Sequence, residues 1–474
     1  MIGILLAAGR GTRMKSEKPK VLFKINDEPM AFAPLRCLIE LCDKVLIVIG
    51  HGGEDVKSEL TNRIKEVYGD SPLSSKVHFV TQDPPKGTGD AVKTAFAAYP
   101  GKWKNEDQLL VLNGDLPLIK EDTLKFLIDE FNKKKLSSAC LSFFTRNPKG
   151  FGRIYRDKRG IFSKIIEEND ATEEEKRIAE VNSGVYLFQV SELISALEKL
   201  KINTKKQEFY LTDVLGNKEN LASEALAWKS PRDLMGVNTT FELAKARSLA
   251  QMRLLKNLAE NIGVDFLDPR RTYISARAKF HGPCQVGPGT MILGRSEIGA
   301  GVQITGNAYI ADSKIGSNTI VDWSSVIKES EIGQSAHIGP MAHLRPKTHL
   351  GDEVRVGNFV ETKNTHMAKG AKAAHLSYLG DSEIGEQTNI GCGTITCNYD
   401  GFNKLKTTIG KRAFIGSDSQ LVAPVNIGDD AYIGSGTTVT QDVPNGALAL
   451  SRSNLVIKEG YAKKLAALKK KSKE

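Results

Sequence analysis

The chain has few of the features that would place it outside the cytoplasm. It carries six cysteines in 474 residues, and none of them forms a Cys-x-x-Cys pair or a cluster with histidine. We therefore expect reduced thiols rather than disulfides or a zinc site, and a cytoplasmic protein. No apolar run approaches the length of a membrane span, so integral membrane association is not expected. The six cysteines are Cys37, Cys42, Cys140, Cys284, Cys392 and Cys397.

The opening apolar run, residues 2–8, does not have the features of a signal peptide. It lacks a basic leader, is short for a signal core, and leads directly into Arg10 and Arg13. It is better explained as a buried first strand.

Aromatic residues are scarce, at 7%, and do not alternate with basic residues as they do in many nucleic-acid-binding proteins. The net charge of +10 therefore does not predict a nucleic-acid partner. Anionic small substrates explain it equally well. Much of the excess lies in a tail that we expect to be frayed, at Lys463, Lys464, Lys469, Lys470, Lys471 and Lys473.

The most regular feature of the chain is an aliphatic residue at every sixth position of its last two hundred residues. One series runs Ile320, Val326, Ile332, Ile338, Leu344, Leu350 and Val356, and a second runs Ile409, Ile415, Leu421, Ile427, Ile433 and Val439. Many of these residues are followed by glycine. A fixed short period of this kind indicates a solenoid.

A period of six fits neither an amphipathic helix nor plain strand alternation. It fits a parallel β-helix in which three six-residue units close one triangular coil, with each aliphatic side chain in the narrow interior. The glycines that follow, such as Gly333 and Gly339, tolerate the sharp turns between faces because they have no Cβ.

The first 237 residues instead alternate short apolar runs with helical stretches. Strands are predicted at residues 2–6, 44–49, 77–80, 109–112 and 139–143, with a helix at 90–98. This order predicts a mostly parallel α/β sheet, which binds ligands at the carboxyl ends of its strands.

The first predicted strand leads into a glycine turn with cations, residues 6–14, followed by Pro19 and Lys20. Its backbone amides could face a phosphate chain, with Arg13 and Lys20 supplying positive charge. The string has neither the third glycine of a dinucleotide fingerprint nor the Gly-Lys-Ser/Thr of a P-loop, so it favours neither class. The glycine spacing alone would by default indicate a structural turn with two solvated cations.

The complete set of motifs is more specific than that turn. It consists of residues 6–14 and 19–22, Gln82, 87–89, 113–118, 150–154, 166–167 with 170–172, 181–184 and 236–238. These strings resemble the signature of sugar nucleotidyltransferases. Together with the solenoid, nearly the whole chain resembles the bifunctional N-acetylglucosamine-1-phosphate uridylyltransferase/glucosamine-1-phosphate N-acetyltransferase family. The resemblance implies a Rossmann-like α/β nucleotidyltransferase domain, a linker helix and a left-handed parallel β-helix.

The resemblance assigns roles to residues of the first domain. It implies that Arg13 and Lys20 stabilise the transition state as UTP transfers its uridylyl group to N-acetylglucosamine-1-phosphate. The backbone around the first strand end, together with residues that read the uracil and the sugar, would bind UTP and the product. These binding residues are Leu6, Ala7, Ala8, Gly9, Lys20, Gln82, Gly87, Thr88, Gly152, Glu167, Asn182 and Asn238.

A magnesium site is expected at Asp115 and Asn238. Asp115 follows a predicted buried strand, where a lone carboxylate is either a helix cap or a ligand for a hard cation, and Asn238 could add a neutral oxygen. By resemblance, both residues hold Mg²⁺ against the nucleotide phosphates.

Two residues depart from the family pattern. Asn113 stands where an aromatic residue is frequent, and Asp90 stands where histidine is common. Either departure could alter a contact on the nucleotide side.

A helical connector is predicted after the first domain. Thr239 and Glu242 have the spacing of a capping box, and apolar residues then recur at helical spacing up to Gly263. We expect the domains to span 1–238, 239–263 for the linker helix, and 264–474 for the acetyltransferase domain with its basic tail.

One segment of the solenoid interrupts the repeat, at residues 402–408, and insertions in solenoids often form binding loops. His375 lies near it. A single histidine is usually structural, but imidazole also suits the base that must deprotonate an amine before it attacks a thioester. The resemblance implies that His375 is this catalytic base.

The remaining acetyltransferase residues come from the same resemblance. Those implied to bind glucosamine-1-phosphate are Arg345, Lys363, Tyr378, Asn389 and Lys404. Those implied to bind acetyl-CoA are Cys392, Asn398, Tyr399, Ser417, Ser435 and Arg452, of which Cys392 stands where alanine is usual. Arg345 can hold a phosphate through two parallel hydrogen bonds. The resemblance also implies a homotrimer with acetyl sites between subunits.

Two other functions share parts of this architecture. In one, a nucleotidyltransferase-like subunit uses its hexapeptide domain only for assembly or regulation. In the other, the chain is a monofunctional pyrophosphorylase for a different sugar. The presence of His375, Arg345 and the motif 398–401 favours the bifunctional enzyme, which would make UDP-N-acetylglucosamine.

Overall fold

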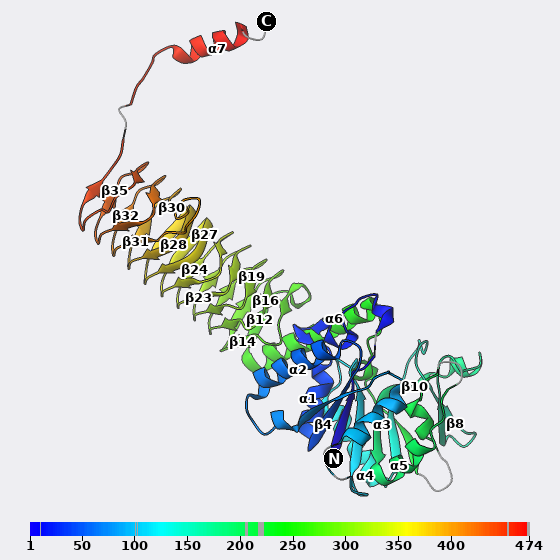
Figure 1. Cartoon of the computed structure of the whole chain (residues 1–474). Coiled ribbons are helices and arrows are strands. Elements are labelled where there is room, and N and C mark those ends of the chain that lie inside the picture. The colour runs from blue at the N-terminus through cyan, green and yellow to red at the C-terminus, as the bar shows by residue number, and fades with distance from the viewer. Residues whose placement is uncertain are drawn as a thin grey trace. The chain divides into compact units, whose positions relative to one another are not determined.

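The chain divides into two compact units, Met1–Leu254 and Leu255–Glu474 (Figure 1). The computed structural model describes residues 1–9, 11–99, 101, 103–203, 207–216, 222–452 and 455–471. No helix in these described ranges is long and apolar enough to cross a membrane.

The first unit is built on one mixed sheet with the strand order β11-β7-β10-β6-β1-β4-β5. The pairs β1–β4, β1–β6, β4–β5 and β7–β11 are parallel, whereas β10 runs antiparallel to β6 and β7. The mostly parallel sheet and all five predicted strands are therefore confirmed. The strands are β1 Ile2–Leu6, β4 Lys44–Ile49, β5 Val77–Thr81, β6 Gln108–Asn113, β7 Ser138–Phe144, β10 Glu180–Gln189 and β11 Ser223–Ala227, with the hairpins β8 Arg153–Arg156/β9 Phe162–Ile166 and β2 Lys24–Ile25/β3 Glu28–Pro29.

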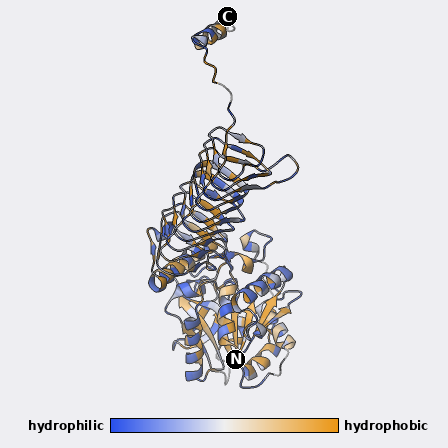
Figure 2. Ribbon diagram, turned by 90° about the vertical axis from the view of Figure 1, so that its left-hand side faces the viewer, coloured by the Kyte–Doolittle hydropathy of each residue, from blue (hydrophilic) through white to orange (hydrophobic). Residues whose placement is uncertain are grey.

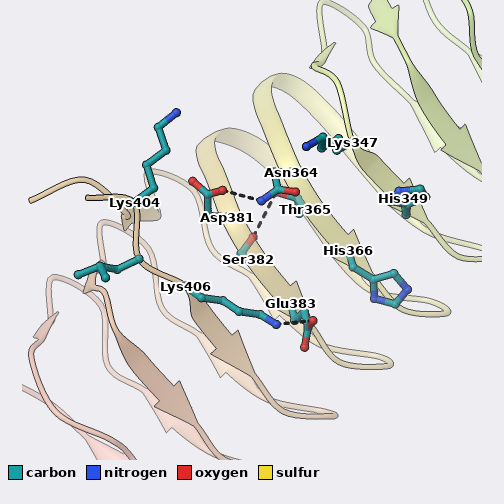
Figure 3. A pocket seen from close by; sticks show the side chains of 11 residues that line it. Lys347, His349, Asn364, Thr365, His366, Asp381, Ser382, Glu383, Lys404 and Lys406 are labelled. Atoms are coloured by element: carbon teal, nitrogen blue, oxygen red, sulfur yellow. Dashed lines mark hydrogen bonds and ion pairs between the residues drawn. The ribbon is translucent and has the colours of Figure 1, made fainter. Parts of the chain in front are cut away.

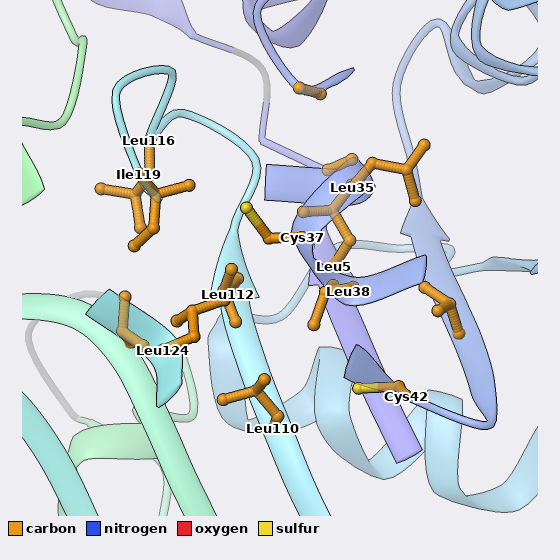
Figure 4. Close-up of a cluster of buried hydrophobic side chains, with 14 of the residues drawn as sticks. Leu5, Leu35, Cys37, Leu38, Cys42, Leu110, Leu112, Leu116, Ile119 and Leu124 are labelled. Carbon is orange, nitrogen blue, oxygen red and sulfur yellow. The ribbon is translucent and has the colours of Figure 1, made fainter. Parts of the chain in front are cut away.

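Alternate residues of the central strands belong to two different cores. Leu5 and Leu110 belong to the core under α1 and α4 (Figure 4), and Ile4 and Val111 to the core under α3 and α5. A strand covered on both faces needs an unbroken apolar run, which explains the composition of β1 and β6. The helices are α1 Phe32–Leu41, α2 Gly53–Tyr68, α3 Thr88–Ala98, α4 Glu121–Lys133 and α5 Val190–Glu198, and the 3-10 helices are η1 Thr12–Met14, η2 Lys20–Leu22, η3 Ser74–Lys76, η4 Glu175–Arg177, η5 Leu211–Val214 and η6 Pro231–Leu234.

The predicted connector is α6, Thr240–Ile262. It begins with the expected capping box, because Glu242 N donates to Thr239 Oγ1 at 3.2 Å while Thr239 N donates back to Glu242 Oε2 at 3.0 Å. Leu243 and Ala246 are buried in a small core with Met14. The first part of the helix therefore packs on the first unit, and the division between the units falls inside α6.

The second unit is a left-handed parallel β-helix. Each strand pairs in parallel with the strand one coil further on, as Ser330 does with Thr348 and Ile390 with Ile415. Figure 2 shows apolar and polar residues alternating along its coils. Its strands are β12 Val264–Phe266, β13 Tyr273–Ile274, β14 Lys279–Phe280, β15 Cys284–Val286, β16 Met291–Leu293, β17 Glu297–Ile298, β18 Gln303–Ile304, β19 Tyr309–Ala311, β20 Lys314–Ile315, β21 Ile320–Val321, β22 Val326–Lys328, β23 Ser330–Ile332, β24 His337–Ile338, β25 His343–Leu344, β26 Thr348–Leu350, β27 Arg355–Met367, β28 Lys372–Ile384, β29 Asn389–Ile390, β30 Ile395–Cys397, β31 Thr407–Ile409, β32 Phe414–Ile415, β33 Gln420–Val422, β34 Val425–Ile427, β35 Tyr432–Ile433, β36 Thr438–Val439 and β37 Leu448–Ala449, and the 3-10 helix η7 is Pro269–Arg271.

The prediction that the aliphatic side chains of the six-residue series lie inside the β-helix is confirmed from Ile332 onward but is wrong for Ile320 and Val326. The buried residues there are their neighbours Val321 and Ile327, both 0% exposed. The reason is a change in coil length: Val321 pairs with Ile338, 17 positions on, whereas Ile332 pairs with Leu350, 18 positions on. A shift of one residue moves a strand's side chains to the opposite face.

The predicted interruption is confirmed as an insertion between β30 and β31. Within it, Tyr399 and Lys404 form an antiparallel bridge, and the spacing between paired coils rises to 25 residues. The expectation of a frayed tail is wrong for Tyr461–Lys471, which forms helix α7, and Lys473 lies outside the described residues.

Candidate active sites

Three of the predicted residues of the first domain meet at the carboxyl ends of β1 and β6. Lys20 Nζ lies 2.5 Å from Asp115 Oδ2 and 3.1 Å from Asn238 Oδ1. Arg13 joins them through a 3.0 Å hydrogen bond from Nη2 to the same Asn238 oxygen. Two side-chain oxygens and two cationic side chains from distant parts of the sequence thus form one cluster.

Backbone hydrogen bonds hold the two oxygen-bearing residues in place. Val237 N donates to Asp115 O at 3.0 Å, which joins the segments carrying Asp115 and Asn238. Asn238 N donates to Glu242 Oε2 at 2.8 Å, so the cap of α6 also anchors this residue. The turn after β1 has Gly11 at φ +62°, where a Cβ would lie 2.7 Å from Lys20 Cβ. Only glycine lets the turn pack this closely on Lys20.

The predicted nucleotide-binding backbone lies at the same edge of the sheet. Leu6 O accepts from Gly114 N at 2.9 Å and Ala7 N donates to Val48 O at 2.8 Å, so these groups are committed to the fold. Ala8 is buried and Gly9 is exposed, and a Cβ at Gly9 would meet nothing within 4 Å. The backbone at Gly9 is therefore open to a ligand.

Gln82, Gly87 and Thr88 come together where β5 leads into α3. Gln82 Nε2 donates to Gly87 O at 3.1 Å and to Asp90 Oδ2 at 2.7 Å. Gly87 has φ +100° and lies so close to Phe209 that a Cβ would be 2.6 Å from its carbonyl oxygen. Thr88 Oγ1 accepts from Leu211 N at 3.1 Å.

The three predicted sugar-binding residues are also neighbours. Asn182 N donates to Gly152 O at 2.8 Å, and a Cβ at Gly152 would lie 3.6 Å from Glu167 Oε1. Thr212 Oγ1 donates to that Glu167 oxygen at 2.9 Å, and Asn182 Nδ2 donates to Tyr186 Oη at 2.7 Å. Burial raises the pKa of Tyr186 above its usual range, so its hydroxyl stays protonated.

Asn113, the other departure from the family pattern, lies at the end of β6 beside Gly184. A Cβ at Gly184 would overlap the carboxamide of Asn113. Gly184 has φ +80°, and β10 shifts register between Asn182 and Tyr186. The register shift lets the chain pass close to Asn113.

In the β-helix, Lys363 and Lys404 form a cluster of positive charge with Arg345. The nearby ammonium of Lys404 lowers the pKa of Lys363, and Arg345 adds to the effect. Arg345 Nη1 donates to Glu361 Oε1 at 2.7 Å, which holds the guanidinium in place. Like charges held together in this way favour an anion such as a phosphate.

Asp381 lies between this cluster and the inserted segment. It accepts hydrogen bonds from Asn398 Nδ2 and, at 2.6 Å, from Asn364 Nδ2. A Cβ at Gly380 would lie 2.5 Å from Tyr378 Oη and 2.8 Å from Asn398 Nδ2. The side chains of these two predicted residues therefore lie next to each other over Gly380.

A groove of about 310 Å³ borders the same region, and Lys404 is one of its lining residues. Figure 3 shows Lys406 directed toward Glu383 while the Lys404 side chain extends away from it. Lys404 is therefore not neutralised by Glu383.

His375 is exposed on β28, where it is paired in register with Asn358. Ser377 Oγ donates to the His375 carbonyl at 2.9 Å, which fixes the backbone. Asn389 is half-buried at the start of β29, one coil after Lys372. The described contacts thus leave the imidazole of His375 accessible.

The predicted acetyl-CoA residues form a file along one corner of successive coils. Asp418 N donates to Cys392 O at 2.7 Å and Gly436 N donates to Ser417 O at 2.8 Å, so Cys392, Ser417 and Ser435 follow one another. A Cβ at Gly434 would lie 3.6 Å from Arg452 Nη2, which puts Arg452 beside the end of this file. Tyr399, 63% exposed, stands in the insertion and donates to Gly401 O at 2.6 Å.

Three residues of these clusters were not predicted from the sequence. Thr212 contacts Glu167, Glu361 holds Arg345, and Asp381 holds Asn398. Asp381 lies six residues after His375 in the sequence, and that neighbourhood was the one available signal for it.

Comparison with known proteins agrees with this division of the chain. Residues 3–213 match the family described as the MobA-like NTP transferase domain, and residues 406–441 match the bacterial transferase hexapeptide family. The bifunctional protein GlmU of Syntrophotalea carbinolica is 42% identical, over 96% of this chain and 95% of that protein. The proteins of the same name from Fervidobacterium nodosum, 42% identical over 97% of each chain, and Listeria monocytogenes, 40% identical over 98% of each, are similar over the same length.

The chain belongs to the GlmU family. It is a bifunctional transferase with a uridylyltransferase and an acetyltransferase activity. This membership favours the bifunctional enzyme over the two single-function interpretations. A solved structure titled a putative glucose-1-phosphate thymidylyltransferase from Bacillus anthracis, 22% identical with a TM-score of 0.41, covers 53% of this chain and 95% of that one.

Proposed function

We propose that the enzyme makes UDP-N-acetylglucosamine in two steps. The β-helix unit transfers the acetyl group of acetyl-CoA to glucosamine-1-phosphate, and the first unit then transfers uridylyl from UTP to the product, releasing pyrophosphate. The observation that carries the proposal is the convergence of Arg13, Lys20, Asp115 and Asn238 at one edge of the α/β sheet. The domain boundaries proposed are 1–238, 239–263 and 264–474.

Divalent metal is generally required by nucleotidyltransferases of this family. The residues present fit Mg²⁺, because Asp115 Oδ2 and Asn238 Oδ1 already converge on one cation, the ammonium of Lys20. When bound there, Mg²⁺ would neutralise phosphate charge and orient the triphosphate.

The chain's own part in uridylyl transfer is positioning and charge. The phosphate oxygen of the sugar attacks the α-phosphorus of UTP, and the bond to the pyrophosphate breaks. Arg13 and Lys20 offset the charge that spreads over the phosphoryl oxygens. Gln82, Gly87 and Thr88 bind the uracil, and Gly152, Glu167 and Asn182 bind the sugar. Leu6, Ala7, Ala8 and Gly9 contribute backbone at the nucleotide.

In acetyl transfer, His375 is the base. It takes a proton from the substrate ammonium, the free amine attacks the thioester carbonyl, and the carbon–sulfur bond breaks to release coenzyme A. Arg345, Lys363 and Lys404 bind the phosphate of glucosamine-1-phosphate, and their mutual repulsion is relieved when the anion binds. Tyr378 and Asn389 orient the sugar.

Asn398 and Tyr399 lie near the reacting groups in this proposal, with Cys392, Ser417, Ser435 and Arg452 along the coenzyme A. Support comes from the file of these residues on one corner of the coils. Because His375 is exposed in the single chain, a neighbouring subunit can complete the site, and we propose a cytoplasmic homotrimer.

The test is a coupled assay that supplies glucosamine-1-phosphate, acetyl-CoA and UTP and omits each in turn. UDP-N-acetylglucosamine should form only when all three are present. With N-acetylglucosamine-1-phosphate as the starting sugar, acetyl-CoA should become dispensable. Product formation without acetyl-CoA from the unacetylated sugar would contradict the proposed order.

A further inference from the structure

The carboxamide of Gln82 is held in one orientation by its surroundings. Gln82 is 3% exposed, and its backbone is tied to β4 because Gln82 N donates to Ile49 O at 2.8 Å. The side-chain nitrogen donates to two oxygens, Gly87 O at 3.1 Å and Asp90 Oδ2 at 2.7 Å. Asp90 stands in the first turn of α3, whose N-cap is Gly87.

The chemistry of these two partners leaves no ambiguity about which end of the carboxamide faces them. A carbonyl oxygen and an ionised carboxylate can only accept hydrogen bonds. The NH₂ group of Gln82 must therefore face Gly87 and Asp90, and Oε1 must point the other way. Turning the carboxamide over would set three acceptor oxygens against one another, with no donor between them.

The opposite end of the carboxamide is available to a ligand. In the described part of the chain, Gln82 Oε1 accepts no hydrogen bond. This oxygen is also not fully buried, so a ligand can reach it. Gln82 thus presents a fixed acceptor, and no donor, at the site where the nucleobase is proposed to bind.

We propose that Asp90 is a positioning residue for base selection: it locks Gln82 so that Oε1 accepts the N3–H of the base. Uracil carries a proton at N3, whereas cytosine carries a lone pair there. The locked oxygen therefore pairs with UTP and faces a like acceptor in CTP. This inference rests on the proposed role of Gln82 in reading the base.

A purely structural role for Asp90 makes a different prediction. An acidic residue in the first turn of a helix interacts favourably with the helix dipole. If that were the whole role of Asp90, removing its charge would lower stability and affect UTP and CTP equally. The ratio of kcat/KM for the two nucleotides separates the two roles.

The experiment compares UTP and CTP with N-acetylglucosamine-1-phosphate on the full-length enzyme and on Asp90→Asn. The new amide can donate to Gln82 Oε1, so the reversed orientation of the Gln82 carboxamide has one acceptor clash, with Gly87 O, in place of two. We expect the UTP:CTP ratio of kcat/KM to fall about tenfold or more, mainly because CTP improves, since a site built around one hydrogen-bond pattern rejects the mismatched base through unpaired groups. Asp90→Glu keeps an acceptor and should retain most of the selectivity.

Asp55→Asn is the matched control, because Asp55 is an acidic residue in the first turn of another helix, α2, and is exposed. It should leave the ratio unchanged. Should Asp90→Asn not fold, Asp90→Ser tests the same point, because its hydroxyl can donate or accept. An unchanged ratio in folded Asp90→Asn or Asp90→Ser, or an equal loss with both nucleotides, would overturn the proposal. Failure of the unmodified enzyme to use UTP would instead overturn the proposed function.

Discussion

The ammonium of Lys20 lies 2.5 Å from the carboxylate of Asp115, and it also contacts Asn238, 218 residues further along the chain. Both groups of this ion pair are largely shielded, with side-chain exposures of 13% and 16%. Lys20 and the two residues proposed to hold Mg²⁺, Asp115 and Asn238, thus lie together in one small region at the edge of the sheet.

Replacing Asp115 with alanine should abolish uridylyl transfer and leave acetyl transfer nearly intact. It removes an oxygen that would hold Mg²⁺ and leaves Lys20 without its carboxylate partner, so we expect the rate to fall by about a hundredfold or more. Mn²⁺ binding, followed by electron paramagnetic resonance, should weaken in parallel. Asp122→Asn, in the first turn of α4, is the control. Loss of both activities in a folded Asp115 variant would contradict independent sites.

His375→Ala should have the reverse effect. Without a base to deprotonate the substrate ammonium, acetyl transfer should fall by about 10² to 10⁴. Uridylyl transfer from N-acetylglucosamine-1-phosphate should change less than about twofold, because His375 lies in the other unit. Release of coenzyme A thiol and of pyrophosphate measure the two reactions separately. His349→Ala, an exposed histidine on β26, should spare both reactions.

The pH dependence of acetyl transfer should reflect the lowered pKa of Lys363. The charged form of lysine exists below its pKa and is lost as pH rises through it, so a lowered pKa moves the loss of phosphate binding to lower pH. We expect kcat/KM for glucosamine-1-phosphate to decline on the alkaline side before an ordinary lysine, with a pKa of about 10.4, would titrate.

Lys404→Met removes the main cause of the lowered pKa of Lys363. It should therefore move the alkaline decline of kcat/KM to higher pH, and it should also weaken binding of glucosamine-1-phosphate. Lys347→Met, from the same groove, should leave the position of this decline unchanged. If the alkaline decline of kcat/KM stays at the same pH in Lys404→Met, a group other than Lys363 controls it.

Thr239→Ala should destabilise the first unit by about 1 kcal/mol, the usual cost of losing a helix N-cap. The capping box also holds the backbone of Asn238, so uridylyl transfer should weaken further than stability alone explains. Urea unfolding, with kcat measured well below the first transition, separates the two effects. Thr240→Ala, one residue inside the helix and exposed, is the control.

Removing the tail after Gly460 should leave pyrophosphorolysis unchanged. The tail includes α7, whose described side chains are exposed, and it belongs to the second unit. A fall in pyrophosphorolysis in the truncated protein would give the tail a role in the first unit.

Prediction from the sequence was most accurate where the local sequence pattern and the packing of the folded chain require the same structure. The apolar runs that became β1 and β6 are covered on both faces, as an unbroken apolar run predicts. The capping box of α6 depends only on residues three positions apart. Prediction of the interior residues failed at Ile320 and Val326 because nothing in the local pattern marks a coil of 17 residues rather than 18.

The sequence by itself determined the two architectures and the position of the insertion, and its motifs supplied the residues proposed for each site. Periodicity and glycine placement are local properties, so they can be read along the chain. Only the tertiary structure brought Asp90 against Gln82, Asp381 against Asn398 and Lys20 between Asp115 and Asn238. These contacts depend on which groups donate and accept after distant segments have packed, and spacing along the chain does not encode that.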